Sequence, residues 1–85
     1  MPSGIKLSNH ALEQMEARGI AYFHVMDTIE EPDSILEESA NERVYQKLIM
    51  FENQKSYLIR VIVNPALSPN LVLTVYRTSK INKYL

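Results

Sequence analysis

The hydrophobic pattern changes its period at Pro32, and this change constrains the fold of the 85-residue chain more than any other feature. Before Pro32, apolar residues recur at the spacing of one helix face. After it, apolar and polar residues alternate as they do in strands. Proline suits such a boundary because it cannot donate a hydrogen bond within a helix or a sheet ladder. The pattern therefore predicts helices followed by strands, which is typical of the α+β class.

Two helices are predicted before this boundary. The first begins at Ser8, a good capping residue, and ends at Gly19, which suits the left-handed position after a helix. Its apolar stripe is Ala11, Leu12 and Met15. The second runs from about residue 21 to residue 31. Its apolar stripe is Ile20, Phe23, Met26 and Ile29.

Four strands are predicted after the boundary, over residues 33–39, 44–52, 56–63 and 71–77. Short loops join them, so successive strands should be antiparallel, and residues 78–85 should form a tail or a final turn. In the last strand, alternation places Val72, Thr74 and Tyr76 on one face. We expect one domain over residues 1–85, with two N-terminal helices packed on one face of a four-stranded antiparallel sheet.

Composition excludes several kinds of site. The absence of cysteine excludes a disulfide scaffold, a thiol nucleophile and a zinc knuckle. The acidic residues around Pro32 should diverge at a helix end, and the two glycines are too far apart for a phosphate loop, so we expect no metal site and no cofactor. No apolar run approaches the roughly 18 residues that span a bilayer, so we expect a cytoplasmic protein without membrane contact.

The charges are distributed unevenly along the chain. Residues 1–42 carry two basic and nine acidic side chains, a net charge of −7. Residues 43–85 carry seven basic and one acidic side chain, a net charge of +6. This asymmetry indicates either a polyanionic partner for the second half or attraction between the two halves.

Arg60 is the most unusual candidate site residue because it interrupts the apolar strand Tyr57–Val63. A guanidinium in a central strand loses hydration unless a partner or solvent reaches it. Arg60 could therefore bind a phosphate, pair with a carboxylate such as that of Glu13, or lie on the solvent face. Tyr76 lies on the next predicted strand and could donate a proton, although tyrosine is also common in half-buried strands.

Two histidines are further candidates. His10 begins the first helix, where it could act as a general acid or base near neutral pH or be an ordinary polar residue. His24 lies among apolar neighbours in the second helix, so packing or surface exposure is the simpler interpretation.

The order of these features resembles a known family. His10 on the first helix is followed by Arg18-Gly19-Ile20, and then by strands carrying Tyr57-Leu58-Ile59-Arg60-Val61 and Thr74-Val75-Tyr76. This order is similar to that of short bacterial proteins under a domain of unknown function, grouped with the RelE/BrnT-like toxins. The resemblance covers nearly the whole chain. It implies the barnase/colicin/RelE-like ribonuclease fold, with RNA on the sheet face opposite the helices.

The resemblance also implies a toxin that cleaves RNA without a metal ion, by attack of a ribose 2′-hydroxyl on the neighbouring phosphate. Arg60 would then stabilise the phosphorane, Tyr76 or Tyr84 would handle protons, and His10 would match the family's helix histidine. The residues expected to bind RNA are Lys47, Arg77, Lys80 and Tyr84. The implied partners are RNA and a cognate antitoxin protein, with no DNA contact indicated. The alternative is a non-catalytic protein-interaction domain on the same fold.

Overall fold

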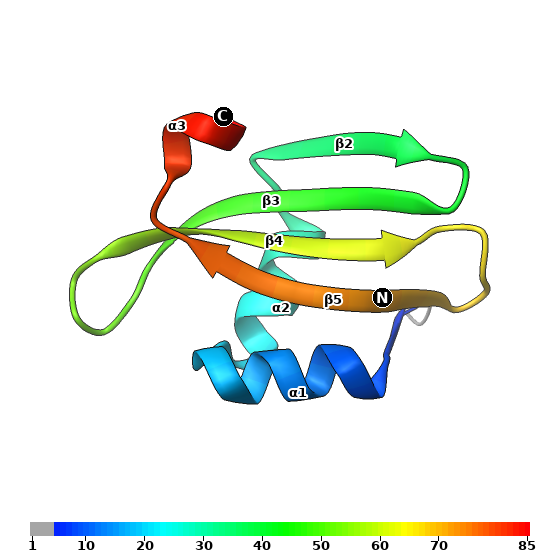
Figure 1. Ribbon diagram of the computed structural model, residues 1–85, viewed down its shortest axis with the longest axis horizontal. Coiled ribbons are helices and arrows are strands. Elements are labelled where there is room, and N and C mark those ends of the chain that lie inside the picture. The colour runs from blue at the N-terminus through cyan, green and yellow to red at the C-terminus, as the bar shows by residue number, and fades with distance from the viewer. Residues whose placement is uncertain (1–4) are drawn as a thin grey trace.

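The computed structural model describes residues 5–85. Its elements in chain order are β1 (Ile5–Leu7), α1 (Asn9–Arg18), α2 (Tyr22–Glu30), β2 (Ser34–Ser39), β3 (Glu42–Met50), β4 (Ser56–Asn64), β5 (Asn70–Thr78) and α3 (Ile81–Tyr84). The strands form one sheet in the order β1-β5-β4-β3-β2 (Figure 1). β1 is parallel to β5, and all the other neighbours are antiparallel.

The expected sheet of four antiparallel strands with two helices is therefore wrong. The sheet has five strands, one pair of them parallel, and a third helix follows β5. β1 has only three residues, too few to show a period, and its partner at Ile5 is Asn70, far along the chain. Local patterns cannot indicate a pairing of this kind. The four predicted strands themselves are present as β2 to β5, with ends shifted by at most two residues.

The predicted ends of α1 are confirmed. The Ser8 hydroxyl accepts a hydrogen bond from the Ala11 N–H (3.0 Å) and donates one to the Leu73 carbonyl of β5 (3.0 Å). One side chain thus caps the helix and attaches it to the sheet. At the other end, Gly19 has φ of 65°, and the next N–H bonds back to the Met15 carbonyl (2.9 Å). That conformation is accessible to glycine without strain.

The stripe predicted for α2 is partly wrong. The buried residues of this helix are Val25 and Thr28, whereas Phe23 is 68% exposed. Thr28 can be buried because its hydroxyl donates to the His24 carbonyl one turn earlier (2.8 Å), which leaves no polar group unsatisfied. The helix is therefore rotated about its axis relative to the orientation that hydrophobicity alone predicts.

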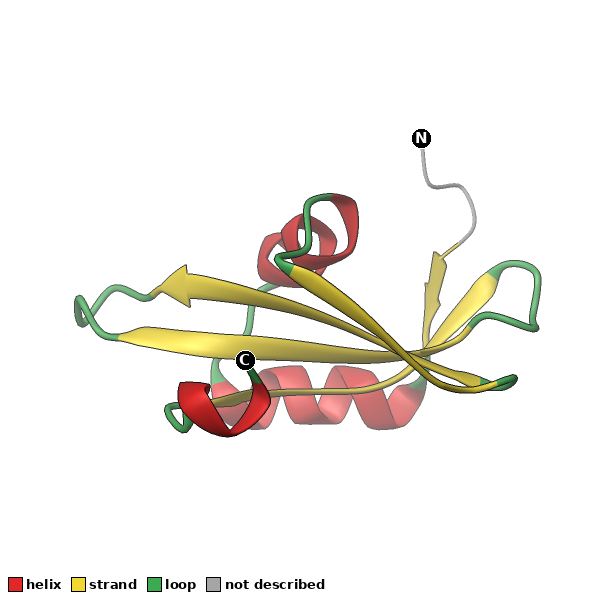
Figure 2. Ribbon diagram, turned by 90° about the horizontal axis from the view of Figure 1, so that it is seen from above, coloured by secondary structure: helices red, strands yellow, loops and turns green. Residues whose placement is uncertain are grey.

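The sheet has two different faces. One face carries the core, which is made of Ala11, Met15, Ile20, Val25, Ile59, Val61, Val63, Val72 and Val75. Both α1 and α2 contribute to this core, and we call this side of the sheet the helix face. The opposite side, which we call the open face, carries the short helix α3 and no other helix of residues 5–85 (Figure 2). Figure 2 shows α2 and α3 on opposite sides of the sheet.

A β-bulge changes which residues of β5 reach each face. Ile62 of β4 pairs with Thr74, but the next residue, Val63, pairs with Val72, so Leu73 is the extra residue. Alternation is broken there, and Val72 is fully buried in the core while Thr74 lies across from Ile62. The prediction that Val72 shares a face with Tyr76 is therefore wrong.

Candidate functional site

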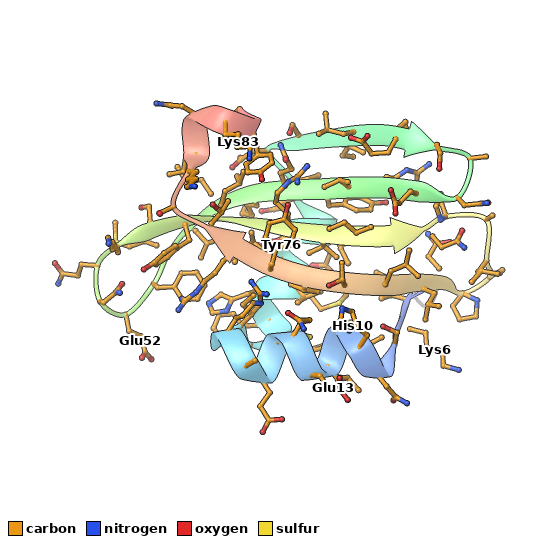
Figure 3. The ribbon with its side chains drawn as sticks, viewed as in Figure 1. Lys6, His10, Glu13, Glu52, Tyr76 and Lys83 are labelled. Atoms are coloured by element: carbon orange, nitrogen blue, oxygen red, sulfur yellow. The ribbon has the colours of Figure 1, made fainter. Side chains whose placement is uncertain are left out.

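A row of polar side chains crosses the open face of the sheet. Ser34 of β2 pairs with Gln46 of β3, Gln46 pairs with Arg60 of β4, and Arg60 pairs with Tyr76 of β5. Side chains at directly paired positions lie next to one another on the same face. We call these four residues the polar row. Figure 3 shows Tyr76 near the centre of the sheet.

Hydrogen bonds link the whole polar row. The Gln46 Nε2 donates to the Ser34 hydroxyl (2.8 Å), and the Arg60 Nε donates to the Gln46 Oε1 (2.7 Å). On its other side, the Arg60 Nη1 donates to the Tyr76 hydroxyl. Gln46 is completely buried, so its amide is a fixed support for the guanidinium. The network therefore holds Arg60 in one orientation from both neighbouring strands.

The short helix α3 brings a second tyrosine to the row. The Tyr84 ring centre lies 4.1 Å from the Arg60 guanidinium carbon, and the Tyr76 ring centre lies 5.7 Å from it. The Tyr84 carbonyl also accepts a longer hydrogen bond from the Gln46 Nε2 (3.4 Å). Both rings thus contact the cation through their electron-rich faces. Lys83, on the same short helix, adds a positive charge 5.5 Å from the Tyr84 ring centre.

Arg60 has no acidic partner in the part of the chain that the structure describes. The ion pair found there, with N···O within 4.0 Å, joins Arg43 to Glu37. Glu13, considered above as a partner, is exposed on α1. A guanidinium has five N–H donors, and Arg60 uses two of them on neutral acceptors. This half-buried cation therefore keeps three donors and its full charge for an anion.

The same cluster changes the acidity of a phenol. Interaction with the Tyr76 hydroxyl, followed by the positive charges of Lys83 and Arg60, lowers the pKa of Tyr84, against the opposing effect of desolvation. A phenol with a lowered pKa is a better proton acceptor near neutral pH than an ordinary tyrosine. The polar row with Tyr84 therefore combines a cation with two groups that can transfer protons.

The other predicted site residues are divided between the two faces. Lys80 precedes α3 and Tyr84 is its last residue, so both follow Tyr76 of the polar row by a few positions in the sequence. Lys47 and Arg77 pair with Ile59, a core residue, so they lie on the helix face. Lys47 donates to the Glu31 carbonyl (2.7 Å) at the end of α2, where it supports that helix end. The structure does not bring these four residues together.

His10 is not part of the cluster. It is exposed in the first turn of α1, apart from Tyr76 in Figure 3. Ser8, two residues before His10, is hydrogen-bonded to Leu73, which is three residues, or about 10 Å, from Tyr76 along β5. The polar row therefore includes Arg60 and Tyr76 of the expected catalytic residues, but not His10.

Gln46 and Ser34 were not expected as site residues. One signal could have identified Gln46. Counting outward from the predicted loop at residues 53–55 pairs residue 52 with residue 56, which puts Gln46 on the face of Arg60 but opposite Ile62, two residues from its observed partner. No comparable signal exists for Ser34, because a β-bulge between Glu37 and Ser39 interrupts the pairing of β2 with β3.

Residues 5–85 were also considered for metal-binding groups and for helices that could span a membrane. These residues contain no group of three or more His, Asp or Glu side chains placed to hold a metal ion. None of their helices has the length and apolar character needed to cross a membrane.

Comparison with known proteins identifies a family. A family model described as a domain of unknown function (DUF4258) matches residues 7–77, which include the polar row but not α3. No curated protein and no solved structure matches the chain significantly.

Proposed function

We propose that this chain, which belongs to the DUF4258 family, is an endoribonuclease that binds and cleaves RNA at the polar row. The observation that supports this most strongly is Arg60, a half-buried cation with three available N–H donors, neutral hydrogen-bond partners and no acidic partner among residues 5–85. An RNA phosphate supplies the negative charge and the paired oxygens that a guanidinium binds best.

In the proposed reaction, a ribose 2′-oxygen attacks the adjacent phosphorus and the bond from phosphorus to the 5′-oxygen breaks. A base removes the proton of the 2′-hydroxyl, and an acid protonates the departing 5′-oxygen. The products are a 2′,3′-cyclic phosphate and a 5′-hydroxyl. Arg60 stabilises the negative charge that grows on the non-bridging oxygens, and its fixed orientation avoids reorganisation during the step.

The two tyrosines are assigned to the proton transfers. Tyr84 has the lowered pKa, which favours it as the group that accepts the 2′-hydroxyl proton. The Tyr76 hydroxyl, whose oxygen accepts a hydrogen bond from Arg60 and which also interacts with Tyr84, is the proton donor assigned to the leaving oxygen. Both rings lie against the same guanidinium, so both hydroxyls belong to the surroundings of a phosphate bound there.

The resemblance to the RelE/BrnT-like toxins supports a cellular role for this activity. In that role the chain is a toxin, and an antitoxin protein keeps it inactive. Expression of the wild-type chain alone should then arrest growth, and co-expression of the product of a neighbouring antitoxin gene should restore it.

Replacement of Arg60 by alanine tests the site directly. We expect Arg60→Ala to lower the cleavage rate of a single-stranded RNA by about a hundredfold or more, with the fold retained. Arg43→Ala is the matched control, because Arg43 is an arginine of the neighbouring strand whose charge is already paired with Glu37. The cyclic phosphate is detected at the new 3′ end, and circular dichroism verifies folding.

The outcomes separate the activity from its location. If the wild-type chain neither cleaves RNA nor arrests growth, the nuclease proposal is wrong. If the wild type cleaves RNA and Arg60→Ala cleaves equally well, the nuclease proposal stands but the polar row is not its site. Tyr76→Phe and Tyr84→Phe each remove one hydroxyl and test the two proton-transfer roles separately.

The alternative function is a non-catalytic protein-interaction domain, and the edge strand β2 favours it. β2 lies at one end of the strand order, with β3 as its partner. It carries the half-exposed side chain of Ile35 and the acidic residues Glu37 and Glu38. A basic, extended segment of another protein could add to this edge as a further strand. An RNA-inactive wild type that recognises such a segment through β2 would support this alternative.

A further inference from the structure

We propose that a second site, on the helix face, binds a single guanine base. A hollow of about 560 Å³ lies between the first part of α2 and the turn that follows β3. Its volume is in the range of small-molecule sites. Arg77 lines it, and since Arg77 pairs with the core residue Ile59, the hollow is on the side of the sheet opposite Arg60. The proposal is independent of RNA cleavage at the polar row.

Aromatic rings line one side of this hollow. The Phe23 and His24 ring centres are 4.3 Å apart, and the His24 and Phe51 ring centres are 4.5 Å apart. Phe23 is 68% exposed, although it belongs to a helix that packs on the sheet with other residues. A planar base can stack on such rings, because every base has a π-face.

Arg77 supplies donors to the same hollow. Its guanidinium carbon lies 4.4 Å from the Phe51 ring centre and 4.5 Å from the Tyr57 ring centre. The two rings hold the guanidinium by stacking, and within residues 5–85 it forms neither an ion pair nor a side-chain hydrogen bond. Its N–H donors are therefore available at the edge of the rings. A guanidinium donates two parallel hydrogen bonds to the O6 and N7 atoms of guanine, a pairing that adenine cannot reproduce.

Two carboxylates complete the set of groups that guanine requires. Asp27 of α2 and Glu52 of the turn line the hollow, and neither has an oxygen within 4.0 Å of a guanidinium nitrogen of Arg77. A cation and carboxylates thus face the same space without neutralising each other. A carboxylate accepts from the N1–H and N2 amino groups of guanine. The same carboxylates repel a phosphate, so the base rather than the phosphate is the group recognised.

His24 adds a donor of known tautomer. Its Nδ1 accepts a hydrogen bond from the Ala21 N–H (2.9 Å), so in the neutral ring the proton is on Nε2. Burial, and then the positive charge of Arg77, lowers the pKa of His24 against the opposing charges of Asp27 and Glu52, which favours the neutral ring. The hollow therefore offers stacking rings, neutral and cationic donors, and carboxylate acceptors.

Binding of guanosine to the full chain tests the proposal. Arg60→Ala serves as the control for the opposite face, and if the hollow is the site this variant should bind guanosine as the wild type does. In a ¹⁵N NMR titration, we expect shifts at the amides of Gly19, Ala21 and Asn53, which line the hollow. Adenosine should bind about tenfold or more weakly, because it lacks the O6 acceptor and the N1–H donor. Inosine, which lacks only the N2 amino group, should be intermediate.

Two substitutions with matched controls test the individual contacts. Arg77→Lys keeps the charge but removes the paired donors, and Asp27→Asn replaces an acceptor oxygen by a donor. Each should weaken guanosine binding about tenfold. The controls are Arg43→Lys on β3 and Glu30→Gln on α2, which do not line the hollow and should leave binding unchanged.

Three results would overturn the proposal. These are the absence of guanosine binding to the folded wild type, equal affinities for guanosine and adenosine, and unchanged binding by both Arg77→Lys and Asp27→Asn. None of them bears on the nuclease proposal, which depends on Arg60 and is measured by RNA cleavage.

Discussion

Arg60 and Tyr76 face each other as a register pair of β4 and β5, and the guanidinium donates a hydrogen bond to the phenol oxygen. On the other side, the same guanidinium donates to the neutral amide of Gln46. A cation at the centre of a sheet is usually balanced by a carboxylate, because an unpaired charge is costly to bury. Here the protein fixes the position of the charge without neutralising it, and the first two predictions depend on this.

Gln46→Glu should inactivate the site without unfolding the protein. The new carboxylate would lie where the amide oxygen now accepts from Arg60 Nε at 2.7 Å, so the two charges would pair. We expect RNA affinity, measured by fluorescence anisotropy, to fall about tenfold or more. Gln14→Glu is a closely matched control, because Gln14 also accepts a hydrogen bond from an arginine, Arg18, but is on α1. Equal losses in both variants would show that only net charge matters.

Tyr84 should determine the pH dependence of cleavage. Because its pKa is lowered, we expect the rate to rise with pH and to level off below the pH at which an ordinary tyrosine ionises, near 10. Tyr84→Phe should remove this rise, whereas Tyr22→Phe on α2 should keep it. Ultraviolet titration gives a second measurement, in which one phenol ionises early in the wild type. A rise that persists in Tyr84→Phe would exclude Tyr84 as the base.

His24 should make the fold less stable in mild acid. Burial lowers its pKa in the folded chain, so below the unfolded value of about 6.5 the unfolded chain binds more protons. The free energy of unfolding should therefore decrease as the pH falls from about 7 through the lowered pKa. Urea denaturation should show this decrease in the wild type and in His10→Gln, but a smaller one in His24→Gln. Equal slopes in the two variants would contradict the prediction.

Met15→Ala tests the position of the core. Met15 is only 7% exposed and packs in the cluster between α1 and the sheet, so its truncation should cost about 2–5 kcal/mol. Leu12 belongs to the same predicted stripe but is 47% exposed, so Leu12→Ala should cost less than about 1 kcal/mol. Chemical denaturation measures both values. Similar costs for the two variants would show that α1 is rotated from the orientation described.

Local patterns predicted the parts of this fold that depend on neighbouring residues. Ser8 and Gly19 mark the ends of α1 because capping and the left-handed conformation are local requirements. The four long strands follow from alternation in the same way. The pairing of Ile5 with Asn70 could not be predicted, because it depends on where the completed sheet leaves an edge.

Part of the candidate site could also be predicted from the sequence. Arg60 stands out in an apolar strand, and Tyr76 follows on the next strand, so both could be proposed from the sequence. The bulge at Leu73 could not, and it places Val72 in the core rather than on the face of Tyr76. The basic residues of the second half of the chain could not be assigned to one site from the sequence. Their net charge does not indicate that Arg77 and Arg60 lie on opposite faces of the sheet.

The attachment of β1 and α1 to β5 has a consequence for synthesis of the protein. Residues 5–18 leave the ribosome well before residues 70–78, the strand that receives them. Until then, α1 lacks β5, the strand that it contacts most, and so remains without its main packing partner. Contacts this distant in sequence slow folding, so the domain should close in one late step after translation of β5. A nascent chain interrupted before Asn70 would expose apolar surface of this kind to chaperones and proteases.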